Sequence, residues 1–159
     1  MVDIYQVLKR LNIQYVRYDH PPVFTCEDAA KHWQNIKGRH CKNLFLRNQK
    51  GNRHYLIIAP DEKVIDLKKL AVEIGESRFS FGSPERLKKY LGVEPGSVSP
   101  FGLINDKNKE TIVVIDEEAR QSDRLAFHPN VNTATLEISQ ADFRHFLDFC
   151  GNRVMVKKL

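Results

Sequence analysis

Residues 42–59, with the sequence KNLFLRNQKGNRHYLIIA, predict the central element of the fold. Two apolar runs, Lys42 to Arg47 and His54 to Ala59, have the length and the side-chain content of β-strands. The residues between them, Asn48 to Asn52, include the asparagine and glycine that are typical of a tight turn. The stretch therefore predicts a β-hairpin.

The segments around this hairpin alternate between helical and strand patterns. Helices are predicted at residues 4–11, 25–33, 66–75, 84–91 and 140–150, and capping residues precede or begin four of them: Asp3, Thr25, Ser83 and Ser139. Further strands are predicted at residues 14–18, 78–81, 101–104, 111–115, 125–128, 133–138 and, as an edge strand, 154–156. Because tight turns join several strands, we expect a mixed α+β fold, with a mostly antiparallel sheet flanked by helices.

Composition indicates one soluble domain that covers residues 1–159. The chain has 159 residues, of which 42% are hydrophobic and 28% charged, as in ordinary globular proteins. No apolar run approaches the roughly 20 residues that span a bilayer, and residues 1–12 do not resemble a signal peptide. We therefore expect a cytoplasmic protein without a membrane partner. The net charge of +5 permits a polyanionic partner but does not require one.

Several common site types lack their sequence patterns. No glycine-rich nucleotide-binding loop is present, and the six histidines and three cysteines show no metal-binding spacing. We therefore expect no cofactor and no metal. Cys26 lies at the start of a predicted helix, where a thiol enzyme is one interpretation and a small buried residue the other. The odd number of cysteines indicates free thiols.

Three features can carry chemistry, and each also has a purely structural interpretation. Lys42 precedes an apolar strand, so its ammonium can bind a phosphate at the end of the sheet or can simply be solvated. The loop from Gly96 to Gly102 can present backbone N–H groups to a developing oxyanion or can merely connect two elements. His128 can bind a substrate or stabilise a turn.

Four segments, taken in order, resemble the YbaK/prolyl-tRNA-synthetase-associated editing family. They are HPPVFT at 20–25, KNLFL at 42–46, PGSVSPFGL at 95–103 and FHPNVNTAT at 127–135. The resemblance extends over nearly the whole chain, and it is greatest to free-standing ProX-type members, which hydrolyse alanine from mischarged prolyl-tRNA. It implies a compact mixed α/β domain with a cleft for the aminoacylated end of tRNA.

The resemblance also implies roles for individual residues. Lys42 corresponds to the essential lysine of the family, and Asn43 to the polar residue beside it. Gly96 and Gly102 bound the catalytic loop that faces the ester. The expected substrate-binding residues are Thr25, Asn43, Ser97, Phe101, His128, Asn132 and Thr133.

The activity that the resemblance implies is hydrolysis of the ester in mischarged tRNA(Pro), with alanine as the amino acid removed. A pocket distinguishes one methylene or sulfur only weakly, so cysteine or serine stays open as the amino acid. A non-catalytic module that binds the tRNA acceptor end or a synthetase is a further alternative. The expected partners are aminoacylated tRNA and, as a second one, prolyl-tRNA synthetase; the oligomeric state stays open.

Overall fold

A computed structural model describes residues 2–22 and 36–159 of the chain. The helix predicted at residues 25–33, the substrate-binding role of Thr25 and the thiol of Cys26 all lie outside the described residues.

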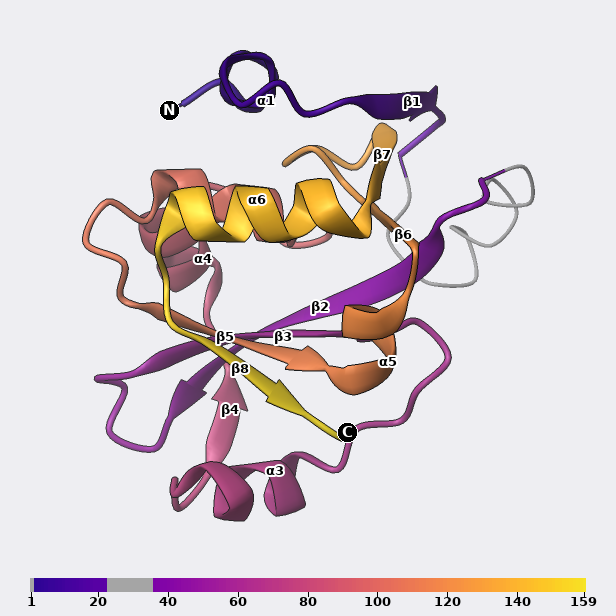
Figure 1. The fold of residues 1–159 in the computed structure, drawn as a ribbon. Helices are drawn as coiled ribbons and strands as arrows, with labels where there is room; N and C mark the ends of the chain where they lie inside the picture. The colour runs from indigo at the N-terminus through magenta and orange to yellow at the C-terminus, as the bar shows by residue number, and fades with distance from the viewer. Residues whose placement is uncertain (1, 23–35) are drawn as a thin grey trace.

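The described residues form an eight-stranded mixed sheet with helices packed against it (Figure 1). Seven strands follow the order β1-β7-β6-β2-β3-β5-β8, and β4 pairs separately with β2. Four of the strand pairings are antiparallel and three are parallel, so the expected mixed, mostly antiparallel sheet is confirmed. The strands are β1 (Tyr15–Asp19), β2 (Arg39–Asn48), β3 (His54–Pro60), β4 (Phe79–Phe81), β5 (Thr111–Asp116), β6 (Arg124–Phe127), β7 (Ala134–Ser139) and β8 (Val154–Lys157).

The long strand β2 connects the two halves of the sheet. Its first residues, Arg39 and His40, pair in parallel with Leu125 and Ala126 of β6. From Cys41 onward it forms the predicted antiparallel hairpin with β3, and its last residues also pair with β4. The two halves of the sheet therefore meet at the start of β2, two residues before Lys42.

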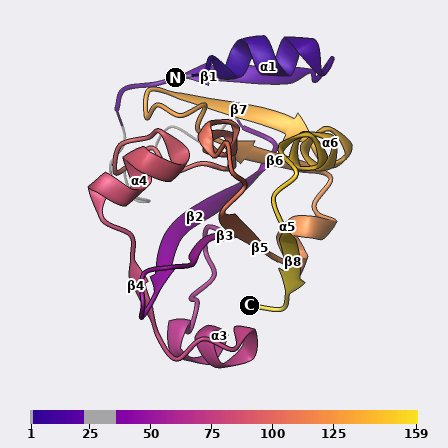
Figure 2. The same ribbon diagram turned by 90° about the vertical axis from the view of Figure 1, so that its left-hand side faces the viewer.

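The helices of the described residues are α1 (Ile4–Arg10), α3 (Leu67–Ile74), α4 (Pro84–Leu91), α5 (Glu117–Gln121) and α6 (Gln140–Cys150). Helices α4 and α6 lie on one side of the strands β2, β3 and β5 and α3 lies on the other, while α1 lies beside β1 (Figure 2). The predicted caps Asp3, Ser83 and Ser139 each accept a hydrogen bond from a backbone N–H in the first turn, and Asp66 does the same for α3. The main core lies against α1, α4 and α6. A smaller apolar cluster lies between the sheet and α3.

Two local predictions differ from the structure. The strand predicted at residues 101–104 is wrong, because Pro100–Asn105 forms a 3-10 helix, η1, capped by Ser99. Proline is well suited to the first position of a helix, and Gly102 donates its backbone N–H to the Ser99 carbonyl at 3.0 Å. Helix α5 was not predicted, although Asp116 followed by two glutamates is a helix-start pattern.

Candidate active site

Lys42 lies near the start of β2, and its side chain is half-buried. Its Nζ donates a hydrogen bond to the backbone carbonyl of Lys63, in the turn that follows β3. One of the three ammonium protons is therefore held by the protein. The other two have no partner in the described part of the chain and can bind a phosphate, a hydroxyl or a carbonyl oxygen.

Asn43 follows Lys42 directly and therefore points to the opposite face of the strand. This is the face on which Cys41 and Phe45 contribute to the main core. The Asn43 side-chain oxygen is buried and has no hydrogen-bond partner among the described residues. A buried amide oxygen without a partner costs free energy, so this oxygen is a candidate to accept a hydrogen bond from a substrate.

His128 follows the last residue of β6, the strand that pairs with the start of β2. The parallel pairing places Arg39 opposite Leu125 and His40 opposite Ala126, and two more residues along each chain lead to Lys42 and His128. Lys42 alternates with Cys41 of the main core and therefore projects from the opposite face of β2. The pairing of β2 with β6 brings the strands that carry the two motifs side by side, although the motifs are distant in the sequence.

Hydrogen bonds fix the orientation of His128 and of its neighbour His20. His128 Nδ1 lies 2.9 Å from the Ala134 carbonyl, and His20 Nδ1 lies 2.9 Å from the Pro21 carbonyl. Since a carbonyl only accepts, each Nδ1 carries the proton. His20 Nε2 lies 2.8 Å from the Thr135 hydroxyl, and the two imidazole rings are 6.0 Å apart.

The charge state of His128 follows from this environment. Burial lowers the pKa of His128 and the adjacent His20 lowers it further, although the bond to the Ala134 carbonyl acts in the opposite direction. His128 is therefore neutral at physiological pH, with its proton on Nδ1. Its Nε2 lone pair can then accept a hydrogen bond from a substrate or a water.

The loop from Gly96 to Gly102 uses several of its backbone N–H groups internally. Ser97 N–H donates to the Glu94 carbonyl at 3.1 Å, and Gly102 N–H to the Ser99 carbonyl at 3.0 Å. Phe101 N–H donates to the Ser99 hydroxyl at 3.2 Å. Among the described residues, the N–H groups of Gly96, Val98 and Ser99 have no such partner, so they are the loop's available donors.

Three residues of this loop also have clear structural roles. Phe101 is fully buried in the main core. A Cβ atom on Gly102 would lie 2.9 Å from the backbone oxygen of Leu91, so only glycine permits the close approach of η1 to α4. Gly96 has a φ of 91°, a conformation that favours glycine.

One hydrogen bond joins the loop to the segment that contains His128. Asn130 Nδ2 donates to the Phe101 carbonyl at 3.3 Å. Thr133 is exposed and accepts a hydrogen bond from His20 N–H through its carbonyl, and Asn132 is half-buried beside it. The bond from Asn130 links two of the motifs that the sequence singled out, the loop Gly96–Gly102 and the segment that contains His128.

Comparison with known proteins places this arrangement in a family. A family model described as the aminoacyl-tRNA editing domain matches residues 20–146, which include all three motifs. The chain belongs to the aminoacyl-tRNA editing domain family.

Relatives of this editing domain match it over most of their length. A protein of Acetoanaerobium sticklandii named prolyl-tRNA editing protein ProX is 41% identical over 91% of this chain and 88% of its own. The prolyl-tRNA synthetase associated domain-containing protein 1 of Danio rerio is 31% identical over 92% of this chain and 80% of its own.

Two solved structures share the fold of the editing domain. The hypothetical protein APE2540 superimposes with a TM-score of 0.74 at 17% identity and covers 98% of both chains. A proposed trans-editing enzyme for prolyl tRNA synthetase superimposes with a TM-score of 0.70 at 18% identity, over 100% of this chain and 98% of its own.

The two cysteines that the structure describes are poor nucleophiles. Cys41 and Cys150 are free and buried, and burial raises the pKa of each thiol to about 12. The expectation of free thiols is confirmed for this pair.

Within residues 2–22 and 36–159, no group of three His, Cys, Asp or Glu side chains is arranged to hold a metal ion. The same residues contain no helix that is long and apolar enough to cross a membrane.

Sequence reasoning missed His20 and Thr135 as neighbours of His128. The signal was present in part, because His20 opens one of the four family-like segments and Thr135 closes another. Only the antiparallel pairing of β1 with β7, which sets Tyr18 opposite Thr135, places the two segments side by side.

Proposed function

We propose that this editing domain hydrolyses the ester bond of mischarged tRNA(Pro), and that alanine is the amino acid it removes. The observation that carries the proposal is the 41% identity to a prolyl-tRNA editing protein over 91% of the chain. Lys42 and His128, each oriented by a hydrogen bond to a backbone carbonyl, support it with groups that can bind such a substrate.

In the proposed site, each motif has a distinct task. The Lys42 ammonium binds the terminal phosphate or ribose region of the tRNA. The N–H groups of Gly96, Val98 and Ser99, which have no partner among the described residues, bind the carbonyl oxygen of the ester as negative charge develops on it. Neutral His128 accepts a hydrogen bond from the substrate through Nε2.

The reaction needs no covalent nucleophile. The ammonium group of an aminoacyl ester already activates its carbonyl, so a correctly placed water can attack it, assisted by the terminal ribose hydroxyl. The C–O bond to the ribose then breaks, which releases the amino acid and the tRNA. Orientation and oxyanion binding together are worth several kcal/mol.

Selection between alanine and proline depends on size in this proposal. Asn132 and Thr133, which lie in the segment between His128 and β7, form part of the wall around the amino acid. This wall leaves room for an alanyl group and excludes the larger prolyl ring. A pocket that excludes the correct product by size acts as the second sieve of an editing reaction.

The proposed partner is the acceptor end of aminoacylated tRNA(Pro). Prolyl-tRNA synthetase is a second proposed partner, because it is the source of the mischarged substrate. We place the reaction in the cytoplasm, where tRNA is charged. The net charge of +5 is compatible with a polyanionic substrate.

The proposal is tested with a panel of tRNA(Pro) charged with Ala, Ser, Cys or Pro. The wild-type protein is expected to release alanine fastest and to leave prolyl-tRNA intact. Lys42→Ala is expected to abolish release while the circular dichroism spectrum and Tm stay close to wild type. Lys68→Ala, which removes an exposed lysine, is the matched control. Wild-type turnover in Lys42→Ala would reject the assigned site.

A further inference from the structure

We propose that Lys63 is a positioning residue for Lys42, an inference that rests on the proposed function because Lys42 is the group it orients. The backbone of Lys63 forms part of a tight turn after β3, in which its N–H donates to the Pro60 carbonyl at 3.0 Å. Its own carbonyl accepts a hydrogen bond from Lys42 Nζ. The location of this turn therefore decides where the Lys42 ammonium lies.

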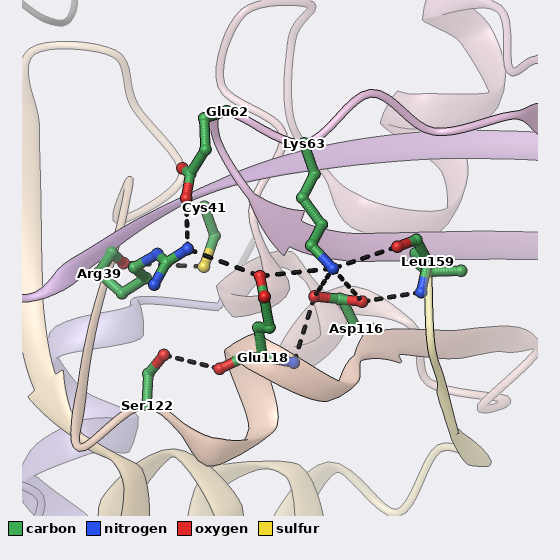
Figure 3. Close-up of polar contacts among 8 residues, drawn as sticks. All are labelled: Arg39, Cys41, Glu62, Lys63, Asp116, Glu118, Ser122 and Leu159. Carbon is green, nitrogen blue, oxygen red and sulfur yellow. Dashed lines mark hydrogen bonds and ion pairs between the residues drawn. The ribbon is translucent and has the colours of Figure 1, made fainter.

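The side chain of Lys63 attaches the turn to the end of β5 and to the last residue of the chain (Figure 3). Its Nζ lies 3.2 Å from Asp116 and 3.3 Å from Glu118, and it donates to the Leu159 carbonyl at 3.1 Å. Asp116 is fully buried and also caps helix α5. An ion pair to a buried carboxylate is costly to break, because the remaining charge is left unpaired.

The residue before Lys63 provides a second attachment. Glu62 forms an ion pair with Arg39 of β2, and Arg39 also lies 3.7 Å from Glu118. Glu118 therefore contacts both Arg39 and Lys63. The turn at residues 60–63 is thus attached to β2 at two places, through the Glu62–Arg39 ion pair and through the hydrogen bond from Lys42 to the Lys63 carbonyl.

The hydrogen bond to the Lys63 carbonyl restricts the Lys42 side chain before a substrate binds. A lysine side chain has many rotamers, and ordering it costs conformational entropy. A carbonyl that is already held in place binds one proton of the ammonium and directs the others before the substrate arrives. A shift of about 1 Å in such a group can lower a rate by up to about a hundredfold.

The test compares Lys63→Met with Lys63→Arg, and uses Lys68→Met as a control because Lys68 is an exposed lysine of α3. Turnover of alanyl-tRNA(Pro) is measured in each. We expect Lys63→Met to lower kcat about tenfold with little change in KM. Lys63→Arg restores most of the rate, because arginine can still pair with Asp116 and Glu118, and Lys68→Met behaves as wild type.

A second measurement reports on Lys42 without using activity. Acetic anhydride modifies free amines, and mass spectrometry gives the rate at which Lys42 is acetylated. We expect faster acetylation of Lys42 in Lys63→Met and an unchanged rate in Lys68→Met. A lower kcat with an unchanged acetylation rate would show that Lys63 does not act through Lys42, and an unchanged kcat would overturn the proposal directly.

Two further outcomes keep the inference separate from the proposed function. If Lys63→Met fails to fold, Glu118→Gln takes its place, because the Glu118 side chain is 53% exposed and its loss is tolerable. In Glu118→Gln we expect kcat to fall and Lys42 acetylation to become faster, each by less than in Lys63→Met. If both kcat and the acetylation rate are unchanged in Glu118→Gln, the positioning role is rejected. Full activity in Lys42→Ala would instead reject the function assigned to Lys42, whatever Lys63 does.

Discussion

Burial of His54 makes the stability of this protein depend on pH. The ring is 2% exposed, and Arg86 Nη1 donates to its Nε2 at 2.7 Å. It also lies against the aromatic rings of Phe45 and Tyr90, at 5.6 and 4.2 Å. Burial, together with the positive charge of Arg86, lowers the pKa of His54 from 6.5 to about 4.

The sign and size of the effect follow from linkage. Between pH 6.5 and about 4 the unfolded chain binds a proton at His54 and the folded chain does not, so stability falls as the pH falls. Working from these two pKa values, acidification from about pH 7 to about pH 5 lowers the free energy of unfolding by about 2 kcal/mol. The lowered pKa of His128 adds a loss of the same sign.

Urea denaturation at the two pH values measures this loss. In His54→Gln the side chain can still accept from Arg86 but cannot titrate, so the loss on acidification is expected to shrink by about 2 kcal/mol. His145→Gln, at an exposed histidine of α6, is the control and keeps the wild-type loss. The reasoning fails if His54→Gln loses as much stability on acidification as the wild type, or if NMR shows that the His54 ring protonates above about pH 5.

Three other predictions concern the site and its packing. Asn43→Ala is expected to change the free energy of unfolding by no more than about 1 kcal/mol, because the lost oxygen has no partner among the described residues. Turnover of alanyl-tRNA(Pro) is expected to fall in the same variant, and a large drop in its Tm would contradict the prediction. Gly102→Ala is expected to cost about 1–3 kcal/mol in urea denaturation, because its Cβ would lie 2.9 Å from the Leu91 backbone; wild-type stability would disprove the packing role. Binding of tRNA, measured by filter retention, is expected to weaken as salt rises, and a flat response would argue against phosphate contacts.

Much of the secondary structure could be predicted because its causes are local. The caps Asp3, Ser83 and Ser139 act within one helical turn, and each begins a helix as expected. The hairpin of β2 and β3 follows from two apolar runs around a turn. The strand predicted at residues 101–104 failed because its apolar residues are buried in a 3-10 helix rather than in a ladder, and a short apolar run does not distinguish the two.

The candidate site could be predicted only as a set of separate motifs. Lys42, Gly96 and His128 were visible as polar or flexible residues beside apolar segments, and the family resemblance connected them. Their mutual geometry was not visible. Nothing in the local sequence indicates that the N–H groups at positions 97, 101 and 102 are used within the loop, or that the carbonyl of Lys63 receives the Lys42 ammonium.

The amino-acid sequence by itself determined the hairpin at residues 42–59, the helix caps and the family, because periodicity, capping and turn chemistry act between near neighbours. The tertiary structure alone decided that β2 starts beside β6, which brings the strand that contains Lys42 beside the strand that leads to His128. Pairing between strands so distant in the chain depends on how all the apolar faces are buried together, and no local segment contains that information.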